Sequence, residues 1–128
     1  MRILVASSDH ETRERLGAFC EASGVGVIEA SSSGEALEAA LIWDVAGAVV
    51  DLVLDGGPGH RVAELIHQCL PSLPLVVITE EGATELSRWA GAHGVTGWLR
   101  KSCDPLELRR ALELIHSRKG QGRVAEGA

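Results

Sequence analysis

Residues 46–54 read Ala-Gly-Ala-Val-Val-Asp-Leu-Val-Leu, and this stretch decides the fold. It is an almost unbroken apolar run that holds one carboxylate, Asp51, and it leads into the turn-forming residues 55–59, Asp-Gly-Gly-Pro-Gly. A continuous run of this kind is typical of a strand that helices cover on both faces, as in a parallel sheet. Asp51 and the loop after it are therefore predicted to follow a central strand.

Apolar runs and amphipathic segments alternate along the rest of the chain. The apolar runs predict strands over residues 3–6, 25–30, 46–54, 73–79 and 95–99. Apolar residues at spacings of three and four predict helices over 11–22, 35–42, 60–70, 83–93 and 105–117. Three helix starts carry the pattern of a capping box: Ser8-x-x-Glu11, Ser32-x-x-Glu35 and Asp104-x-x-Glu107. The alternation predicts a single α/β domain of five βα units.

Composition limits the class of protein. The chain has 128 residues, 45% of them hydrophobic, and a formal net charge of -6. This is the size of one domain, and the apolar content excludes a disordered chain. Apolar runs stop well short of the roughly 20 residues of a membrane span, and the acidic balance argues against nucleic-acid binding. We expect a cytoplasmic protein with its domain over 1–118 and a flexible tail or linker stub over 119–128.

The cysteines and histidines give no metal or redox motif. Cys20, Cys69 and Cys103 are odd in number and far apart, without a CxxC spacing. Cys20 and Cys69 fall on apolar stretches, which predicts small core residues. The histidines show no spacing typical of a metal site on one helix face.

Polar side chains follow four of the predicted strands. They are Ser7-Ser8-Asp9, Asp51, Thr79-Glu80 and Lys101-Ser102. In an open α/β sheet the functional site lies at the carboxyl ends of the strands. A carboxylate, a hydroxyl and an ammonium that meet there suit the handling of a phosphoryl group, with Asp as acceptor, Thr as hydrogen-bond donor and Lys as charge partner.

Three blocks of sequence resemble the receiver domain of bacterial response regulators, the CheY-like fold, over about residues 2–118. Residues 49–59 resemble the phosphoacceptor strand and loop, which places the acceptor at Asp51. Residues 76–79 resemble the strand end that supplies a switch hydroxyl, here Thr79. Residues 94–101 resemble the last strand, with Trp98 at the switch aromatic and Lys101 at the family's lysine. The resemblance implies a flavodoxin-like three-layer sandwich with sheet order 2-1-3-4-5.

The first loop departs from the family pattern. Receivers carry two adjacent acidic residues there that hold Mg²⁺ together with the acceptor, and this chain has Ser7 and Ser8. Magnesium prefers charged oxygen ligands, so we expect a weakened Mg²⁺ site at Asp51. Asp9 is an alternative ligand if the loop reorganises; otherwise Ser8 is the helix N-cap and Asp9 serves the helix dipole in the first turn.

Three further positions depart from the pattern in the same direction. Asp55 stands in place of a proline, Glu80 in place of a small residue, and Ser102 in place of the proline after the lysine. Glu80 is long and anionic, so it would crowd or repel a phosphoryl group. Without proline a cis bond costs about 2.5–4 kcal/mol, which predicts a trans bond and an altered loop after Lys101.

The resemblance implies a non-enzymatic receiver module in two-component or phosphorelay signalling. A histidine kinase or phosphotransfer protein would donate to Asp51, and Thr79 and Lys101 would stabilise the aspartyl phosphate. The output would be contact with an effector protein or a second copy through residues 83–93, 95–99 and 105–117. Trp89 and Trp98 are the interface candidates on that surface.

Two alternatives stay open. The first is a pseudo-receiver, a phosphorylation-independent interaction or dimerisation module in which Asp51 and Lys101 form a retained structural ion pair. The second is a flavodoxin-like enzyme or nucleotide binder. The second is disfavoured because no glycine-rich phosphate loop follows the strand over 3–6, where Ser7-Ser8-Asp9-His10 stands instead.

Overall fold

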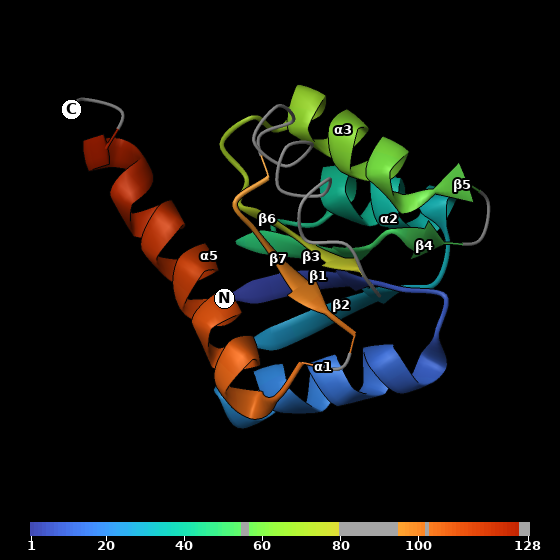
Figure 1. Cartoon of the computed structure of the whole chain (residues 1–128). Helices are drawn as coiled ribbons and strands as arrows, with labels where there is room; N and C mark the ends of the chain where they lie inside the picture. The colour runs from blue at the N-terminus through green and yellow to red at the C-terminus, as the bar shows by residue number, and fades with distance from the viewer. Residues whose placement is uncertain (55–56, 80–94, 102, 126–128) are drawn as a thin grey trace.

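A parallel sheet forms the centre of the computed structural model, which describes residues 1–54, 57–79, 95–101 and 103–125 (Figure 1). Its strands are β1 (Arg2–Ala6), β2 (Gly26–Ala30), β3 (Gly47–Asp51), β6 (Leu75–Thr79) and β7 (Gly97–Arg100). They lie in the order β2-β1-β3-β6-β7, and every pair is parallel. With the long strands counted alone, this is the predicted order 2-1-3-4-5.

The long apolar run over 46–54 does not form one strand. The structure ends β3 at Asp51, and the next residues form a separate antiparallel ladder of β4 (Val53–Leu54) with β5 (Gly57–Pro58). The backbone N–H of Val53 donates to the Asp51 carboxylate, Oδ1, at 3.0 Å, which bends the chain away from the sheet. The prediction of a strand to residue 54 was therefore wrong at its end.

Helices cover both faces of the sheet. They are α1 (His10–Ala22), α2 (Ser33–Ile42), α3 (Gly59–Cys69) and α5 (Pro105–Ala125). α1 and α5 lie on one face, and α2 and α3 lie on the other (Figure 1). The predicted helix over 83–93 lies outside the described residues. α5 continues past the predicted end at residue 117, while the role of residues 119–128 as a tail or linker stays a prediction.

The continuous apolar runs bury side chains on both faces because successive strand residues point in opposite directions. In β1, Ile3 and Val5 pack under α1 and α5, and Leu4 and Ala6 pack under α2 and α3. All four are 0% exposed. This two-sided burial explains why the runs show no alternation of polar and apolar residues.

Gly47 allows α5 to approach the sheet closely. A Cβ atom at this position would lie 2.4 Å from Cγ2 of Ile115, a side chain that is itself 0% exposed. The first residue of β3 is therefore limited to glycine by the packing of α5.

Two of the three predicted helix caps are confirmed. Ser32 accepts from the backbone N–H of Glu35 at the start of α2, and Asp104 accepts from that of Glu107 at the start of α5. The prediction for α1 was wrong, because its N-cap is Asp9 and not Ser8. The Ser8 hydroxyl donates instead to the carbonyl oxygen of Val53, at 3.2 Å, and so is drawn away from the helix.

Cys20 is a core residue, as predicted, and burial raises the pKa of its thiol to about 11. Cys103 is also buried. The prediction for Cys69 was wrong, since it is the last residue of α3 and lies exposed at the helix end. Among the described helices, none has the length and apolar content needed to cross a membrane.

Candidate functional site

Asp51 is a buried carboxylate at the carboxyl end of the central strand. Its exposure is 1%, although ionised side chains are rarely buried without partners. Two donors reach the same oxygen, Oδ2: the hydroxyl of Ser7 at 2.7 Å and the ammonium of Lys101 at 3.2 Å. Asp51 is thus held by the residue after β1 on one side and by the residue after β7 on the other.

The hydroxyl of Ser7 both donates and accepts a hydrogen bond. It is 0% exposed, and its oxygen accepts from the backbone N–H of Asp9 at 3.1 Å while its hydrogen points to Asp51. Because a carboxylate only accepts, the direction of the bond to Asp51 is fixed. Ser7 therefore acts as a donor toward the carboxylate.

Ser8 points to a second oxygen of the same loop. Its hydroxyl donates to the carbonyl oxygen of Val53, two residues after Asp51. The two serines thus direct one hydroxyl hydrogen to the side chain at the end of β3 and the other to the first residue of β4. Together they join the loop after β1 to this part of the chain.

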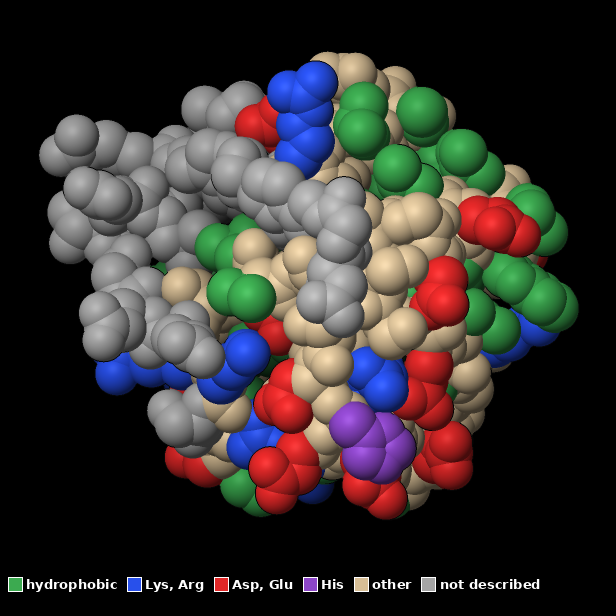
Figure 2. Space-filling view, turned by 90° about the vertical axis from the view of Figure 1, so that its right-hand side faces the viewer, with side chains coloured by type: hydrophobic (Ala, Val, Ile, Leu, Met, Phe, Trp, Pro, Cys, Tyr) green, Lys and Arg blue, Asp and Glu red, His purple; other side chains and the backbone are tan. Residues whose placement is uncertain are grey.

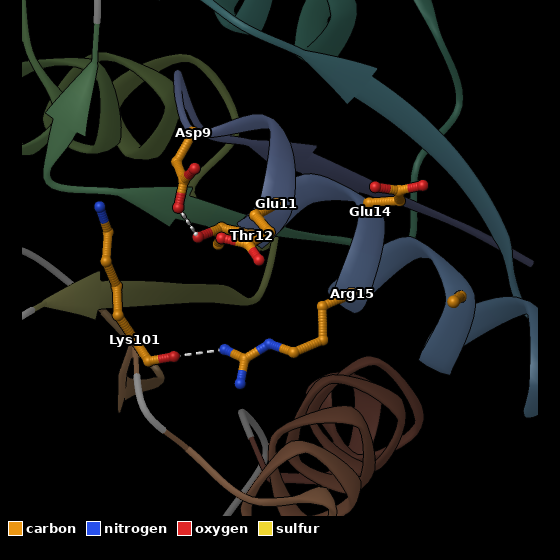
Figure 3. A pocket seen from close by; sticks show the side chains of 7 residues that line it. Asp9, Glu11, Thr12, Glu14, Arg15 and Lys101 are labelled. Carbon is orange, nitrogen blue, oxygen red and sulfur yellow. Dashed lines mark hydrogen bonds between the residues drawn. The ribbon is translucent and has the colours of Figure 1, made fainter.

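Asp9 caps α1 and faces an open pocket of about 590 Å³ (Figure 3). Its carboxylate accepts from the hydroxyl of Thr12 at 2.5 Å, and this bond lowers the pKa of the Asp9 carboxyl; the nearby Lys101 contributes in the same direction. Figure 3 shows Lys101 extending along the opposite side of the pocket from Glu11 and Glu14. Asp9 thus occupies the N-cap position of α1, one residue before the first-turn position expected for it, and its side chain makes no cap hydrogen bond to the helix backbone; its role as a metal ligand stays a prediction.

Arginine side chains from α1 hold the loops around the site. Arg13 donates to the backbone carbonyl oxygen of Ser7 at 2.6 Å and pairs with Glu29 at 3.4 Å. Arg15 donates to the carbonyl oxygens of Lys101 and Cys103. The sequence analysis missed both residues, since the spacing of arginines on a helix does not indicate which loop they reach.

Figure 2 shows the molecule from the end that carries the loops after β1 and β3. Acidic and basic side chains gather in its lower part, over α1. Exposed or half-buried charged residues at the start of this helix include Glu11, Arg13, Glu14 and Arg15. The site thus opens beside a strongly charged helix surface of mixed sign.

Thr79 and Trp98 lie on the neighbouring strands. Thr79 is the last residue of β6 and is half-buried, and its carbonyl oxygen accepts from the backbone N–H of Lys101 at 2.9 Å. Trp98 on β7 is half-buried and packs against Ala63 and Val77. Asp55, Glu80, Trp89 and Ser102, which the sequence analysis also singled out, lie outside the residues whose side chains the structure describes.

The sequence is similar to that of response regulators. A family model described as "Response regulator receiver domain" matches residues 3–113. A cyclic di-GMP phosphodiesterase of Thermotoga maritima is 33% identical over 117 residues, which cover 91% of this chain and 31% of that protein. The photosynthetic apparatus regulatory protein RegA of Cereibacter sphaeroides is 33% identical over 110 residues, which cover 86% of this chain and 60% of that protein. The chain thus spans about a third of the first relative and 60% of the second.

Solved structures show the same fold. A CheY-like receiver domain protein of Methanospirillum hungatei superposes with a TM-score of 0.85 at 21% identity, covering 94% of this chain and 97% of that one. NtrX of Brucella abortus, in complex with ADP, gives a TM-score of 0.88 at 22% identity and covers 99% of this chain and 30% of that one. At these identities the structural similarity shows a shared fold and does not by itself show a shared function.

A five-stranded parallel sheet covered by helices on both faces, with an Asp–Lys pair at its carboxyl edge, is a doubly wound α/β fold. The chain belongs to the response regulator receiver domain family.

Proposed function

We propose that this chain is a receiver module that signals by protein contact without Mg²⁺-dependent phosphorylation, the pseudo-receiver alternative of the sequence analysis. The observation that carries the proposal is the hydroxyl of Ser7, which donates to Oδ2 of Asp51 at 2.7 Å inside the protein. Ser7 and Lys101 together hold the carboxylate in one arrangement.

The donor set does not suit a magnesium ion. Mg²⁺ takes oxygen lone pairs in a near-octahedral arrangement and favours carboxylates. In this site the hydroxyl of Ser7 donates to Oδ2 of Asp51, that of Ser8 donates to the carbonyl oxygen of Val53, and the Asp9 carboxylate is engaged by Thr12. Among the described residues, no group of three or more His, Cys, Asp or Glu side chains could hold a metal ion.

The same contacts oppose phosphoryl transfer to Asp51. An attacking carboxylate oxygen needs an available lone pair, and both lone pairs of Oδ2 already receive donors, while Oδ1 receives the N–H of Val53 and keeps one lone pair; the contacts therefore disfavour attack by Oδ2. The carboxylate is also almost completely covered. Without a metal ion, Lys101 alone would have to offset the negative charge of the incoming phosphoryl oxygens. Enzymatic phosphoryl transfer normally depends on metal ions for that purpose.

In this proposal Asp51 and Lys101 are retained as a structural ion pair. Removing one partner of a buried pair costs about 3–5 kcal/mol because a charge is left uncompensated; the 22% exposure of the Lys101 side chain reduces that cost here. The module would act through contact with an effector protein or a second copy in a two-component pathway. The surface predicted from the sequence, with Trp89 and Trp98, is the candidate for that contact.

The experiment is intact-mass analysis after incubation with phosphoramidate, whose P–N bond resembles that of phosphohistidine, with and without Mg²⁺. The wild-type chain is expected to show no phosphoryl adduct in either condition. The double substitution Ser7→Asp with Ser8→Asp is expected to gain an Mg²⁺-dependent adduct that Asp51→Asn abolishes. Mg²⁺ should also raise the melting temperature of the double variant and leave that of the wild type unchanged, since only a bound ligand stabilises the fold.

The opposite result would support the first interpretation of the sequence, in which Asp51 accepts a phosphoryl group. A single wild-type adduct that disappears with Asp51→Asn would make Asp51 a working phosphoacceptor, with Thr79 and Lys101 stabilising the aspartyl phosphate. An adduct that forms equally without Mg²⁺ would show in addition that phosphorylation does not depend on the metal ion in a chain with Ser7 and Ser8 in its first loop.

A further inference from the structure

Arg15 reaches from α1 to the segment that carries Lys101. Its guanidinium donates to the carbonyl oxygen of Cys103 at 3.1 Å through one terminal nitrogen and to that of Lys101 through the other. The second nitrogen also lies 3.8 Å from the sulfur of Cys103. Figure 3 shows this side chain extending from α1 to the backbone of Lys101.

The two carbonyls belong to the residues on either side of Ser102, the position where receivers carry a proline. A proline restricts a loop through its ring. In this chain the planar guanidinium of Arg15 binds the carbonyl oxygens of Lys101 and Cys103, on the two sides of that position. A guanidinium suits this geometry because its donors are fixed in one plane, whereas a lysine ammonium is a single point of charge on a flexible stem.

We infer that Arg15 is a positioning residue that fixes the backbone carbonyls of Lys101 and Cys103 and thereby helps to keep the Lys101 ammonium on Asp51. The chain of contacts runs from α1 through the Lys101 carbonyl to the Lys101 side chain, which lies 3.2 Å from Oδ2 of Asp51. This inference rests on the proposed function and deepens it, because it concerns the residue that pairs with Asp51 at the same site.

The test uses the reactivity of the two lysines of the chain, Lys101 and Lys119. The full chain is labelled briefly with an acylating ester, and the rate at each lysine is read by peptide mass spectrometry. Arg15→Ala is expected to raise the rate at Lys101 about fivefold, the ratio for the loss of one net hydrogen bond. The rate at Lys119 should match that in Arg110→Ala, which removes an exposed arginine from α5, whereas the urea midpoint of Arg15→Ala should be the lower of the two because its bonds to the carbonyls are lost.

Arg15→Lys separates charge from geometry. It keeps the positive charge but cannot donate to both carbonyls in one plane, so Lys101 should still be labelled faster than in the wild type. Equal rates at Lys101 in Arg15→Ala and Arg110→Ala would overturn the inference, and a wild-type rate in Arg15→Lys would overturn the role of the planar guanidinium. The assay needs neither metal nor phosphoryl donor, so its failure is distinct from failure of the proposed function.

Discussion

The hydroxyl oxygen of Ser7 lies 2.7 Å from Oδ2 of Asp51, and the two residues are 0% and 1% exposed. They are 44 positions apart in the chain, so the contact joins the residue after β1 to the end of β3. A carboxylate taken out of water is costly unless it is paired and hydrogen-bonded. The serine that stands where receivers carry an acid therefore stabilises a group that a second carboxylate would repel.

Ser7→Ala should lower the stability of the domain. The change leaves Asp51 without one donor and the N–H of Asp9 without its acceptor. A hydrogen bond to a charged group contributes about 1.5–3 kcal/mol, and we expect a loss of about 2 kcal/mol in the free energy of unfolding, measured in urea. Ser8→Ala is the matched control: it removes an exposed bond to a backbone carbonyl and should cost about 1 kcal/mol or less. Equal losses in the two variants would contradict this account.

Gly47→Ala should destabilise the packing of α5. The new methyl group would meet Cγ2 of Ile115 at 2.4 Å, and overpacking of a core costs about 1–3 kcal/mol. Gly17→Ala is the control: it adds the same group inside α1 where nothing lies within 4 Å. That change should stabilise the domain by about 0.5–1 kcal/mol because alanine favours a helix over glycine. The signs of the two effects, measured by thermal unfolding, should be opposite.

The three cysteines should differ in reactivity toward an aromatic disulfide reagent at pH 8. Cys69 is exposed, whereas Cys20 and Cys103 are buried, and burial raises the pKa of both buried thiols. The thiolate is the reactive form, so one thiol should react quickly in the native protein and two only after unfolding. Cys69→Ser should abolish the fast phase; a fast phase that persists in this variant would show that a buried thiol becomes accessible.

The bond between Thr12 and Asp9 should make stability depend on pH in the acid range. It lowers the pKa of the Asp9 carboxyl in the folded state below the ordinary value of 3.8. A group with a lowered folded pKa contributes stability above its unfolded pKa, and this is lost as the pH falls through the folded pKa. The difference in urea midpoint between wild type and Thr12→Val should therefore be constant from pH 7 to 5 and shrink below about pH 4.

Thr12→Ser serves as the control for that measurement because it keeps the hydroxyl. It should follow the pH profile of the wild type, apart from a constant offset for the lost methyl group. A difference between wild type and Thr12→Val that stays unchanged down to pH 3 would assign the effect of Thr12 to packing alone.

The sheet and its edge could be predicted from the sequence because they depend on patterns that repeat. Continuous apolar runs indicated strands buried on both faces, and β1 and β3 are buried in this way. The meeting of Asp51 with Lys101 also followed, since parallel strands bring their carboxyl ends to one edge and a lysine side chain spans the neighbouring strand.

The details of the first loop could not be predicted in this way. Ser8 and Asp9 are both good N-caps, and the choice of Asp9 depends on the carbonyl of Val53, which draws Ser8 away from the helix. The bond from Ser7 to Asp51 depends on one hydroxyl rotamer between segments that are far apart in sequence. Arg15 acts through a long side chain that crosses from one element to another, and no periodic pattern reports such a contact.

The burial of Asp51 beside Lys101 has a consequence for how this family is compared across genomes. A lineage that abandoned phosphotransfer would still be penalised for changing either residue alone, because the loss of Lys101 leaves the buried Asp51 carboxylate without its charge partner, and the loss of Asp51 leaves a partly buried ammonium without its own. The route to an apolar pair passes through a less stable intermediate, so selection for folding alone keeps both residues in place. Retention of the aspartate and the lysine in a descendant is therefore no measure of whether the descendant still carries phosphate.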